Sequence, residues 1–144
     1  MNKIVFVCLG NICRSPMAEF VMKELDQEKS LHIESRATSS WEHGNPVHQG
    51  TQKLLRKYAI SFDSSKGSQQ ISQADFEFFD LVVGMDESNI EDLLQISAGR
   101  YDDKIKLFRP GGVPDPWYTG DFEETYKLVT AGCRDWLQWI KDRQ

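Results

Sequence analysis

A short loop between a predicted strand and a predicted helix constrains the fold of this chain more than any other feature. The apolar run Ile4–Val7 predicts a buried strand, and the pair Ser15-Pro16 indicates a helix start. The segment Cys8–Ser15 between them has the sequence Cys-Leu-Gly-Asn-Ile-Cys-Arg-Ser. A loop that opens onto a helix N-terminus points backbone N–H groups and the positive end of the helix dipole at its contents. We therefore expect Cys8–Ser15 to be an anion-binding loop.

The side chains of the anion-binding loop suit phosphate chemistry. Cys8 places a thiol at its start, Arg14 places a guanidinium near its end, and Gly10 and Asn11 stand where left-handed backbone dihedrals are expected. The Cys-x5-Arg spacing alone is weak evidence, and a buried Cys8 beside a capping Arg14 is the alternative. Because the motif also follows a strand and runs into a helix start, we favour a cysteine nucleophile aimed at a phosphate.

Composition sets bounds on the class of protein. A chain of 144 residues with 40% hydrophobic and 27% charged residues is predicted to form one globular domain, residues 1–144. No apolar run approaches the ~20 residues that cross a membrane. The apolar stretch before Cys8 is too short to be the apolar core of a signal peptide. Three cysteines favour reduced thiols in the cytoplasm over a disulfide scaffold. A net charge of −5 without a basic cluster argues against nucleic-acid binding.

Apolar segments alternate with longer amphipathic ones, which predicts an α/β fold. The expected strands are Lys3–Val7, His32–Thr38, Asp80–Gly84 and Lys104–Phe108. The expected helices are Pro16–Glu28, His48–Tyr58, Gln73–Phe78, Ser88–Ile96 and Phe122–Asp142. Strands joined by right-handed helical crossovers form a doubly wound, four-stranded parallel sheet with helices on both faces. The anion-binding loop then follows the first strand.

A second candidate segment, Arg109–Gly120, follows the last predicted strand. Ligands bind at the carboxyl ends of parallel strands, so this segment and Cys8 are expected at the same edge of the sheet. Asp115 lies between Pro114 and Pro116, which restrict its backbone and suit a fixed proton donor. An aspartate that only makes local turn hydrogen bonds is the alternative. Because Asp115 and Cys8 are expected at the same edge of the sheet, we favour a general acid at Asp115 over a turn residue.

Three aromatic residues are candidates for the walls of a cleft over the anion-binding loop. Trp117 and Tyr118 belong to a segment rich in proline and glycine, which is expected to be mostly exposed. Trp41 is equally compatible with a place in the core. Aromatic walls would stack a phenyl ring and favour aryl phosphates over small alkyl phosphates.

Four segments together resemble the low-molecular-weight protein tyrosine phosphatases, in particular a bacterial-type member. The matching segments are Val7–Glu19, Thr38–Trp41, Gly84–Asn89 and Pro114–Tyr118. The resemblance extends over essentially the whole chain. It implies hydrolysis of protein phosphotyrosine and of small aryl phosphates through a cysteinyl-phosphate, without a metal or cofactor. The implied partners are tyrosine-phosphorylated proteins, with phosphate or other oxyanions as ligands.

The resemblance also implies a role for each residue that matches the family motif. Cys8 would be the nucleophile, Arg14 the phosphate clamp, and Asp115 the general acid and then the base. The expected phosphate-binding residues are Leu9, Gly10, Asn11, Ile12, Cys13, Arg14 and Ser15. Within this set, Asn11 would brace the loop and Ser15 would hydrogen-bond the Cys8 thiolate. Trp41, Trp117 and Tyr118 would line the substrate cleft.

Cys13 is not required for hydrolysis. It lies five residues from Cys8 in a curled loop, so the two sulfurs could approach bonding distance. On spacing alone, a buried packing residue and a thiol that traps an oxidised Cys8 remain equally open. The resemblance implies a reversible disulfide and a redox-sensitive enzyme.

The chain departs from the family pattern in places. Ser65–Gln70 replaces a segment that often contains His or Arg, so the bracing of the anion-binding loop is expected to differ. Arg36-Ala37 stand where small residues are common in the family, so the sequence does not predict the conformation of the Trp41 loop. Tyr118 is a single tyrosine where some relatives have two.

Three other functions compete with phosphotyrosine hydrolysis. An arsenate reductase on the same fold needs relay cysteines, and Gly84–Ala98 contains none. A protein-arginine phosphatase carries Thr in place of Ile12 and lacks the large aromatic residue that Trp117 supplies here. A silent phosphate-binding module would lack the nucleophile or the acid. The sequence therefore favours phosphotyrosine as the substrate.

Overall fold

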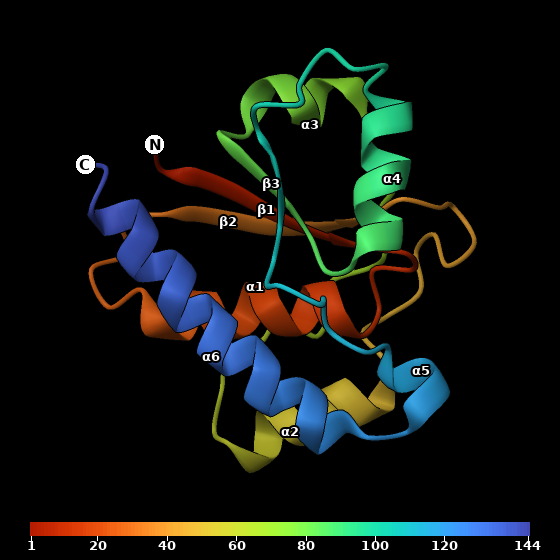
Figure 1. Cartoon of the computed structure of the whole chain (residues 1–144). Helices are drawn as coiled ribbons and strands as arrows, with labels where there is room; N and C mark the ends of the chain where they lie inside the picture. The colour runs from red at the N-terminus through yellow and green to blue at the C-terminus, as the bar shows by residue number, and fades with distance from the viewer.

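The computed structural model describes residues 1–144 and contains one four-stranded sheet and six helices. The strands are β1 (Lys3–Cys8), β2 (His32–Ala37), β3 (Leu81–Gly84) and β4 (Ile105–Leu107). The helices are α1 (Arg14–Leu25), α2 (Gln49–Lys57), α3 (Gln73–Phe78), α4 (Glu87–Ile96), α5 (Pro116–Thr119) and α6 (Phe122–Lys141). All strand pairs are parallel, in the order β2-β1-β3-β4 (Figure 1).

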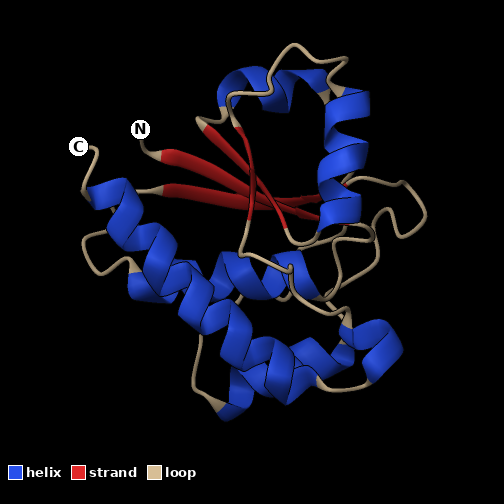
Figure 2. Ribbon diagram, in the orientation of Figure 1, coloured by secondary structure: helices blue, strands red, loops and turns tan.

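Helices cover both faces of the sheet, as Figure 2 shows. Successive side chains of a strand point to opposite faces, and β1 follows this rule. Ile4 and Phe6 belong to the core cluster shared with α1 and α6, whereas Val5 and Val7 belong to the cluster that contains residues of α3 and α4. The doubly wound α/β fold predicted from the sequence is confirmed.

The strand register brings the candidate site together at one edge of the sheet. Cys8 lies opposite Ala37 of β2, and Gly84 of β3 lies opposite Leu107 of β4. The segment that follows β4 is fastened to the end of β3, because the N–H of Val113 donates to the Met85 carbonyl at 2.8 Å. The loops that carry Cys8 and Asp115 therefore meet at the carboxyl ends of the strands.

Two of the differences between the predicted and observed elements bear on the site. Helix α1 begins at Arg14 rather than Pro16, so the guanidinium belongs to the first turn of the helix. Residues 116–119, expected to be loop, form the short helix α5, with Asp115 as its N-cap and Pro116 at its first position. Aspartate followed by proline is a helix-start signal, which the interpretation of this segment as a rigid loop did not take into account.

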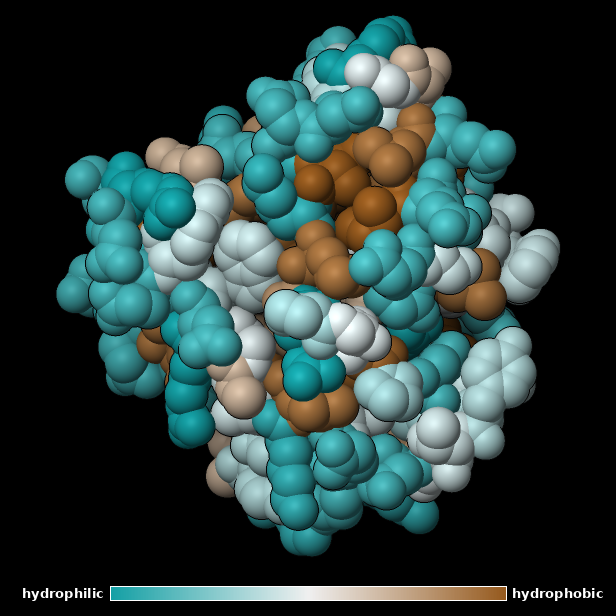
Figure 3. All heavy atoms as spheres, viewed as in Figure 1, coloured by the Kyte–Doolittle hydropathy of each residue, from teal (hydrophilic) through white to brown (hydrophobic).

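The surface in Figure 3 is mostly hydrophilic, with hydrophobic atoms gathered between α4 and the edge strand β4. The two core clusters account for most of the large apolar side chains. None of the helices combines the length and apolar character needed to span a bilayer.

Candidate active site

The anion-binding loop is held from outside through its carbonyl oxygens. The Ser68 hydroxyl donates to the Gly10 carbonyl at 2.8 Å, and the His48 N–H donates to the Ile12 carbonyl at 2.8 Å. No side chain caps the N-terminus of α1. Free backbone N–H groups remain at Leu9, Gly10, Ile12, Cys13 and Arg14, which donate no hydrogen bond within the protein. With its carbonyls bonded outward and its amides free, the loop can bind an anion.

The two residues expected to be left-handed behave differently. Asn11 has φ of 56°, as predicted, but Gly10 does not have a positive φ, so that prediction was wrong. Gly10 instead allows a close approach, because a Cβ at this position would lie 3.3 Å from Cγ of Glu42. The contact is tight rather than prohibitive, because a small movement of the Glu42 side chain would relieve it.

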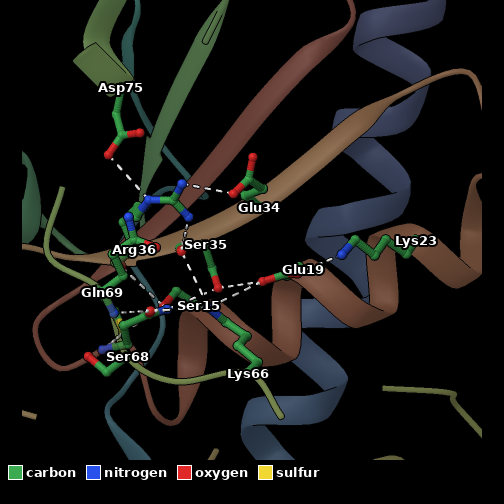
Figure 4. A network of polar contacts seen from close by, with 12 residues as sticks. Ser15, Glu19, Lys23, Glu34, Ser35, Arg36, Lys66, Ser68, Gln69 and Asp75 are labelled. Atoms are coloured by element: carbon green, nitrogen blue, oxygen red, sulfur yellow. Dashed lines mark hydrogen bonds and ion pairs between the residues drawn. The ribbon is translucent and has the colours of Figure 1, made fainter. Parts of the chain in front are cut away.

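The Asn11 side chain braces the loop with all of its hydrogen-bonding capacity. Its amide nitrogen donates to the hydroxyls of Ser15 at 2.8 Å and Ser35 at 2.9 Å. Its oxygen accepts from the Gln69 N–H at 3.1 Å and from Lys66 Nζ at 3.3 Å. Lys66 and Gln69, both labelled in Figure 4, belong to the segment Ser65–Gln70 that departs from the family pattern. That segment therefore supplies bracing, although it contains neither His nor Arg.

Lys66 lies behind the loop in a network of buried charges (Figure 4). Its side chain is only 13% exposed, and Nζ lies 3.8 Å from Oε1 of Glu19. Glu19 Oε1 also accepts from the Ser35 hydroxyl at 2.6 Å, and Oε2 pairs with Lys23 at 2.6 Å. Burial lowers the pKa of Lys66, and the carboxylate of Glu19 opposes that shift. The sequence analysis missed this network, because it joins residues 47 positions apart.

Arg36 faces away from the cleft. Its Nε donates to Asp75 at 3.2 Å, and its Nη2 donates to Glu34 at 2.8 Å (Figure 4). The guanidinium therefore forms its own ion pairs outside the site, and Arg36 adds no positive charge to the Trp41 loop.

Cys8 Sγ has hydrogen-bonding partners from within the loop. The N–H of Asn11 donates to it at 3.3 Å, and the Ser15 hydroxyl lies 3.0 Å away. The Ser15 oxygen accepts from Asn11 Nδ2, and its own proton has two acceptors within reach, the Cys8 sulfur at 3.0 Å and the Arg36 carbonyl at 3.4 Å, of which the sulfur is the closer. The Asn11 N–H and the Ser15 hydroxyl can therefore both donate to the sulfur.

Arg14 is buried, with only 3% of its side chain exposed. Nη1 donates to Asp86 Oδ2 at 2.6 Å and to the Val113 carbonyl at 2.9 Å, while Nη2 lies 3.4 Å from Asp115 Oδ2. Burial works to lower the pKa of Arg14, but the charges of Cys8, Asp86 and Asp115 outweigh it and raise the pKa. The guanidinium is therefore permanently charged and fixed in direction.

Asp86 holds Arg14, and the sequence analysis assigned it no role. Its other carboxylate oxygen accepts the N–H of Asn89 at 2.8 Å, as the N-cap of α4. The available signal was its position, because an aspartate directly after the third parallel strand lies at the same edge as Cys8.

Asp115 points at the anion-binding loop from the opposite side of the cleft. Oδ1 accepts the N–H of Trp117 at 3.0 Å, and Oδ2 faces Arg14. The side chain remains 21% exposed, so a substrate can reach it. The local hydrogen bond that was the alternative to a catalytic role is present, and it orients the carboxylate.

The side chains and loop atoms enclose a cleft of about 220 Å³. Its lining residues are Cys8, Leu9, Gly10, Ile12, Cys13, Arg14, Trp41, Glu42, Asp115, Trp117 and Tyr118. All three predicted aromatic residues are among them. Asn11 and Ser15 lie beneath the loop rather than in the cleft, and Glu42 is a lining residue that the sequence analysis missed.

The fold and the site define the class. A parallel α/β sheet that sets a cysteine, a buried arginine, free loop amides and an aspartate around one cleft is the arrangement of a cysteine-dependent phosphatase. Residues 3–144 match the family described as low molecular weight phosphotyrosine protein phosphatase. The chain belongs to this family.

Known relatives are similar over nearly their whole length. A Bacillus subtilis protein named low molecular weight protein-tyrosine-phosphatase YfkJ is 40% identical, covering 100% of this chain and 99% of the relative. The crystal structure of SP-PTP, a low molecular weight protein tyrosine phosphatase from Streptococcus pyogenes, is 59% identical with a TM-score of 0.95, covering 97% and 93%. A Drosophila arginine phosphatase is 30% identical with a TM-score of 0.86, covering 96% and 98%.

Proposed function

We propose that this enzyme hydrolyses phosphotyrosine in proteins, and small aryl phosphates, through a cysteinyl-phosphate. The convergence of Cys8, Arg14 and Asp115 on one cleft with aromatic walls carries the proposal. Its relatives named as tyrosine phosphatases support it.

In the first step, Cys8 Sγ attacks phosphorus, an S–P bond forms, and the bond from phosphorus to the phenolic oxygen breaks. Asp115 gives its proton to the departing oxygen. Arg14 and the free loop amides bind the other phosphate oxygens, whose charge redistributes in the transition state. The products are a neutral phenol and a phosphorylated Cys8.

In the second step, Asp115 accepts a proton from water while the water oxygen attacks phosphorus. The S–P bond breaks, and inorganic phosphate is released. The Ser15 hydroxyl donates a hydrogen bond to the departing Cys8 thiolate and keeps its proton, consistent with their separation of 3.0 Å. The cycle regenerates the thiolate and the protonated acid.

Phosphoarginine is the competing substrate that one relative makes worth testing. In this chain Ile12 and Trp117 line the cleft with apolar surface, which suits a phenyl ring better than a charged guanidinium. The assay compares a phosphotyrosine peptide, a phosphoarginine peptide and p-nitrophenyl phosphate, each with and without a metal chelator. We expect chelator-insensitive turnover with preference for phosphotyrosine. Preference for phosphoarginine, or no turnover, would overturn the proposal.

Asp115→Asn is expected to lower kcat by on the order of 10², the usual contribution of a general acid. An amide cannot donate the proton, yet it can still accept the Trp117 N–H that orients it. The loss should be larger for phosphotyrosine than for p-nitrophenyl phosphate, because the nitrophenolate leaves more readily without protonation. Equal losses for the two substrates would mean that Asp115 only shapes the cleft.

We further propose that Cys13 protects the nucleophile from irreversible oxidation. Peroxide converts the Cys8 thiolate to a sulfenic acid, and the Cys13 thiol then displaces water to form a disulfide. Burial raises the pKa of Cys13, and the negative charge of Cys8 raises it further. Oxidation of Cys8 removes that second contribution. Such chemistry fits a reducing, cytoplasmic setting, where a dithiol restores both thiols.

Cys13→Ser is expected to remain active but to lose recovery after oxidation. Wild type treated with peroxide should regain activity with dithiothreitol, whereas the variant should not, because its sulfenic acid oxidises further. Activity is measured before peroxide, after peroxide and after the dithiol. Full recovery of the variant would leave Cys13 as a packing residue.

A further inference from the structure

We propose that His48 is a positioning residue that holds the general acid Asp115 in place through the ring of Trp117. This inference rests on the proposed function of Asp115. No contact between His48 and the cleft interior is needed, because the imidazole acts on the segment that carries the acid.

His48 is fixed relative to the anion-binding loop. Its backbone N–H donates to the Ile12 carbonyl at 2.8 Å. Its Nδ1 accepts the N–H of Gly50 at 3.0 Å, which makes His48 the N-cap of α2. Because Nδ1 is an acceptor here, the proton of the neutral ring lies on Nε2. The position and the rotation of the imidazole are thus both set.

The fixed imidazole contacts aromatic rings from two later segments. It meets Trp117 edge to face, with centroids 5.6 Å apart and planes at 79°. It stacks on Phe122, the first residue of α6, with centroids 5.2 Å apart and planes at 19°. Gly50 makes room for this arrangement, because a Cβ there would lie 2.4 Å from the Phe122 ring. His48 therefore joins α2 to both ends of the segment that contains α5.

Trp117 transmits this contact to the acid. The backbone N–H of Trp117 donates to Asp115 Oδ1 at 3.0 Å, so displacement of Trp117 also displaces the carboxylate. Trp117 is 56% exposed, and its only ring-to-ring contact is the one with His48. Helix α5 has four residues and ends at Gly120, whose φ is 71°. So short a helix depends on contacts outside itself for its position.

Two substitutions separate the two interactions of the His48 side chain. His48→Asn keeps an N-cap acceptor for Gly50 and removes the ring. His48→Phe keeps a ring of similar shape and removes the acceptor. A residue that only caps α2 would be rescued by asparagine, whereas a residue that positions the acid would be rescued by phenylalanine.

The test measures kcat/KM for phenyl phosphate, whose leaving group needs a proton, and for p-nitrophenyl phosphate, whose leaving group needs it less. In His48→Asn, we expect the ratio of the two values to fall about two- to tenfold, the range for one lost aromatic contact. Inhibition by inorganic phosphate should be unchanged. His48→Phe should keep the wild-type ratio and show a lower Tm.

Introducing His48→Asn into Asp115→Asn should leave the ratio unchanged, because the acid through which His48 acts is already missing. The inference would be overturned if His48→Asn kept the wild-type ratio of the two kcat/KM values. It would also be overturned if that ratio fell in His48→Phe. If wild-type protein fails to hydrolyse either ester, the proposed function itself fails. If wild type and Asp115→Asn behave as expected while His48→Asn resembles wild type, only the inference fails.

Discussion

Cys8→Ser is expected to abolish turnover while phosphate still binds. A serine hydroxyl at this position is hardly ionised at neutral pH and is a far weaker nucleophile than a thiolate. The groups proposed to bind the anion, Arg14 and the loop amides, do not depend on the sulfur. Hydrolysis of p-nitrophenyl phosphate gives the first readout, and calorimetric titration with inorganic phosphate gives the second.

Cys133→Ser is the matched control for this experiment. Cys133 is fully buried in the core beside α1, where its Sγ donates to the Ala18 carbonyl at 3.6 Å. The same change of sulfur to oxygen should therefore lower stability there without lowering kcat. Substantial hydrolysis by Cys8→Ser, or a loss of turnover in folded Cys133→Ser equal to that of Cys8→Ser, would contradict the assignment of the nucleophile.

The main elements could be predicted because local patterns decide them. Helix α3 spans Gln73–Phe78 as predicted, and its N-terminus has a capping box formed by Ser72 and Asp75. The β-branched run after Lys3 forms the buried strand β1. The carboxyl ends of parallel strands lie at the same edge of the sheet, so the sequence alone predicts that Cys8 and Asp115 lie close together.

Contacts across the fold could not be predicted in the same way. Asp86 meets Arg14 across 72 residues of sequence, and Lys66 meets Asn11 across 55. In the sequence, each of these four polar side chains is equally compatible with an exposed position on a helix or in a turn. The burial of helix α1 is another example. The Ser15-Pro16 start predicts the helix itself, but its residues are buried on nearly every side between the sheet and α6, and its sequence shows no amphipathic pattern that would mark the buried faces. Packing, rather than local sequence, decides such features.

Arg14→Lys is expected to lower kcat/KM by on the order of 10³, the upper range for loss of one preorganised charge-stabilising donor. An ammonium is a point charge and cannot present the planar pair of donors that binds two phosphate oxygens. Lysine is also unable to keep the arginine's bonds to Asp86 and the Val113 carbonyl while reaching the substrate. Kinetics with p-nitrophenyl phosphate and titration with inorganic phosphate should both show the loss.

Arg36→Lys separates this effect from the loss of a buried guanidinium in general. Arg36 is also buried and paired with two carboxylates, Asp75 and Glu34, but it lies outside the cleft. Its replacement should lower Tm and leave phosphate affinity within about twofold, because its charge is already paired. Arg14→Lys should instead weaken phosphate binding as well as turnover, unlike Cys8→Ser, which keeps binding. If Arg14→Lys bound phosphate as wild type does, the clamp would have to be assigned to the loop amides alone.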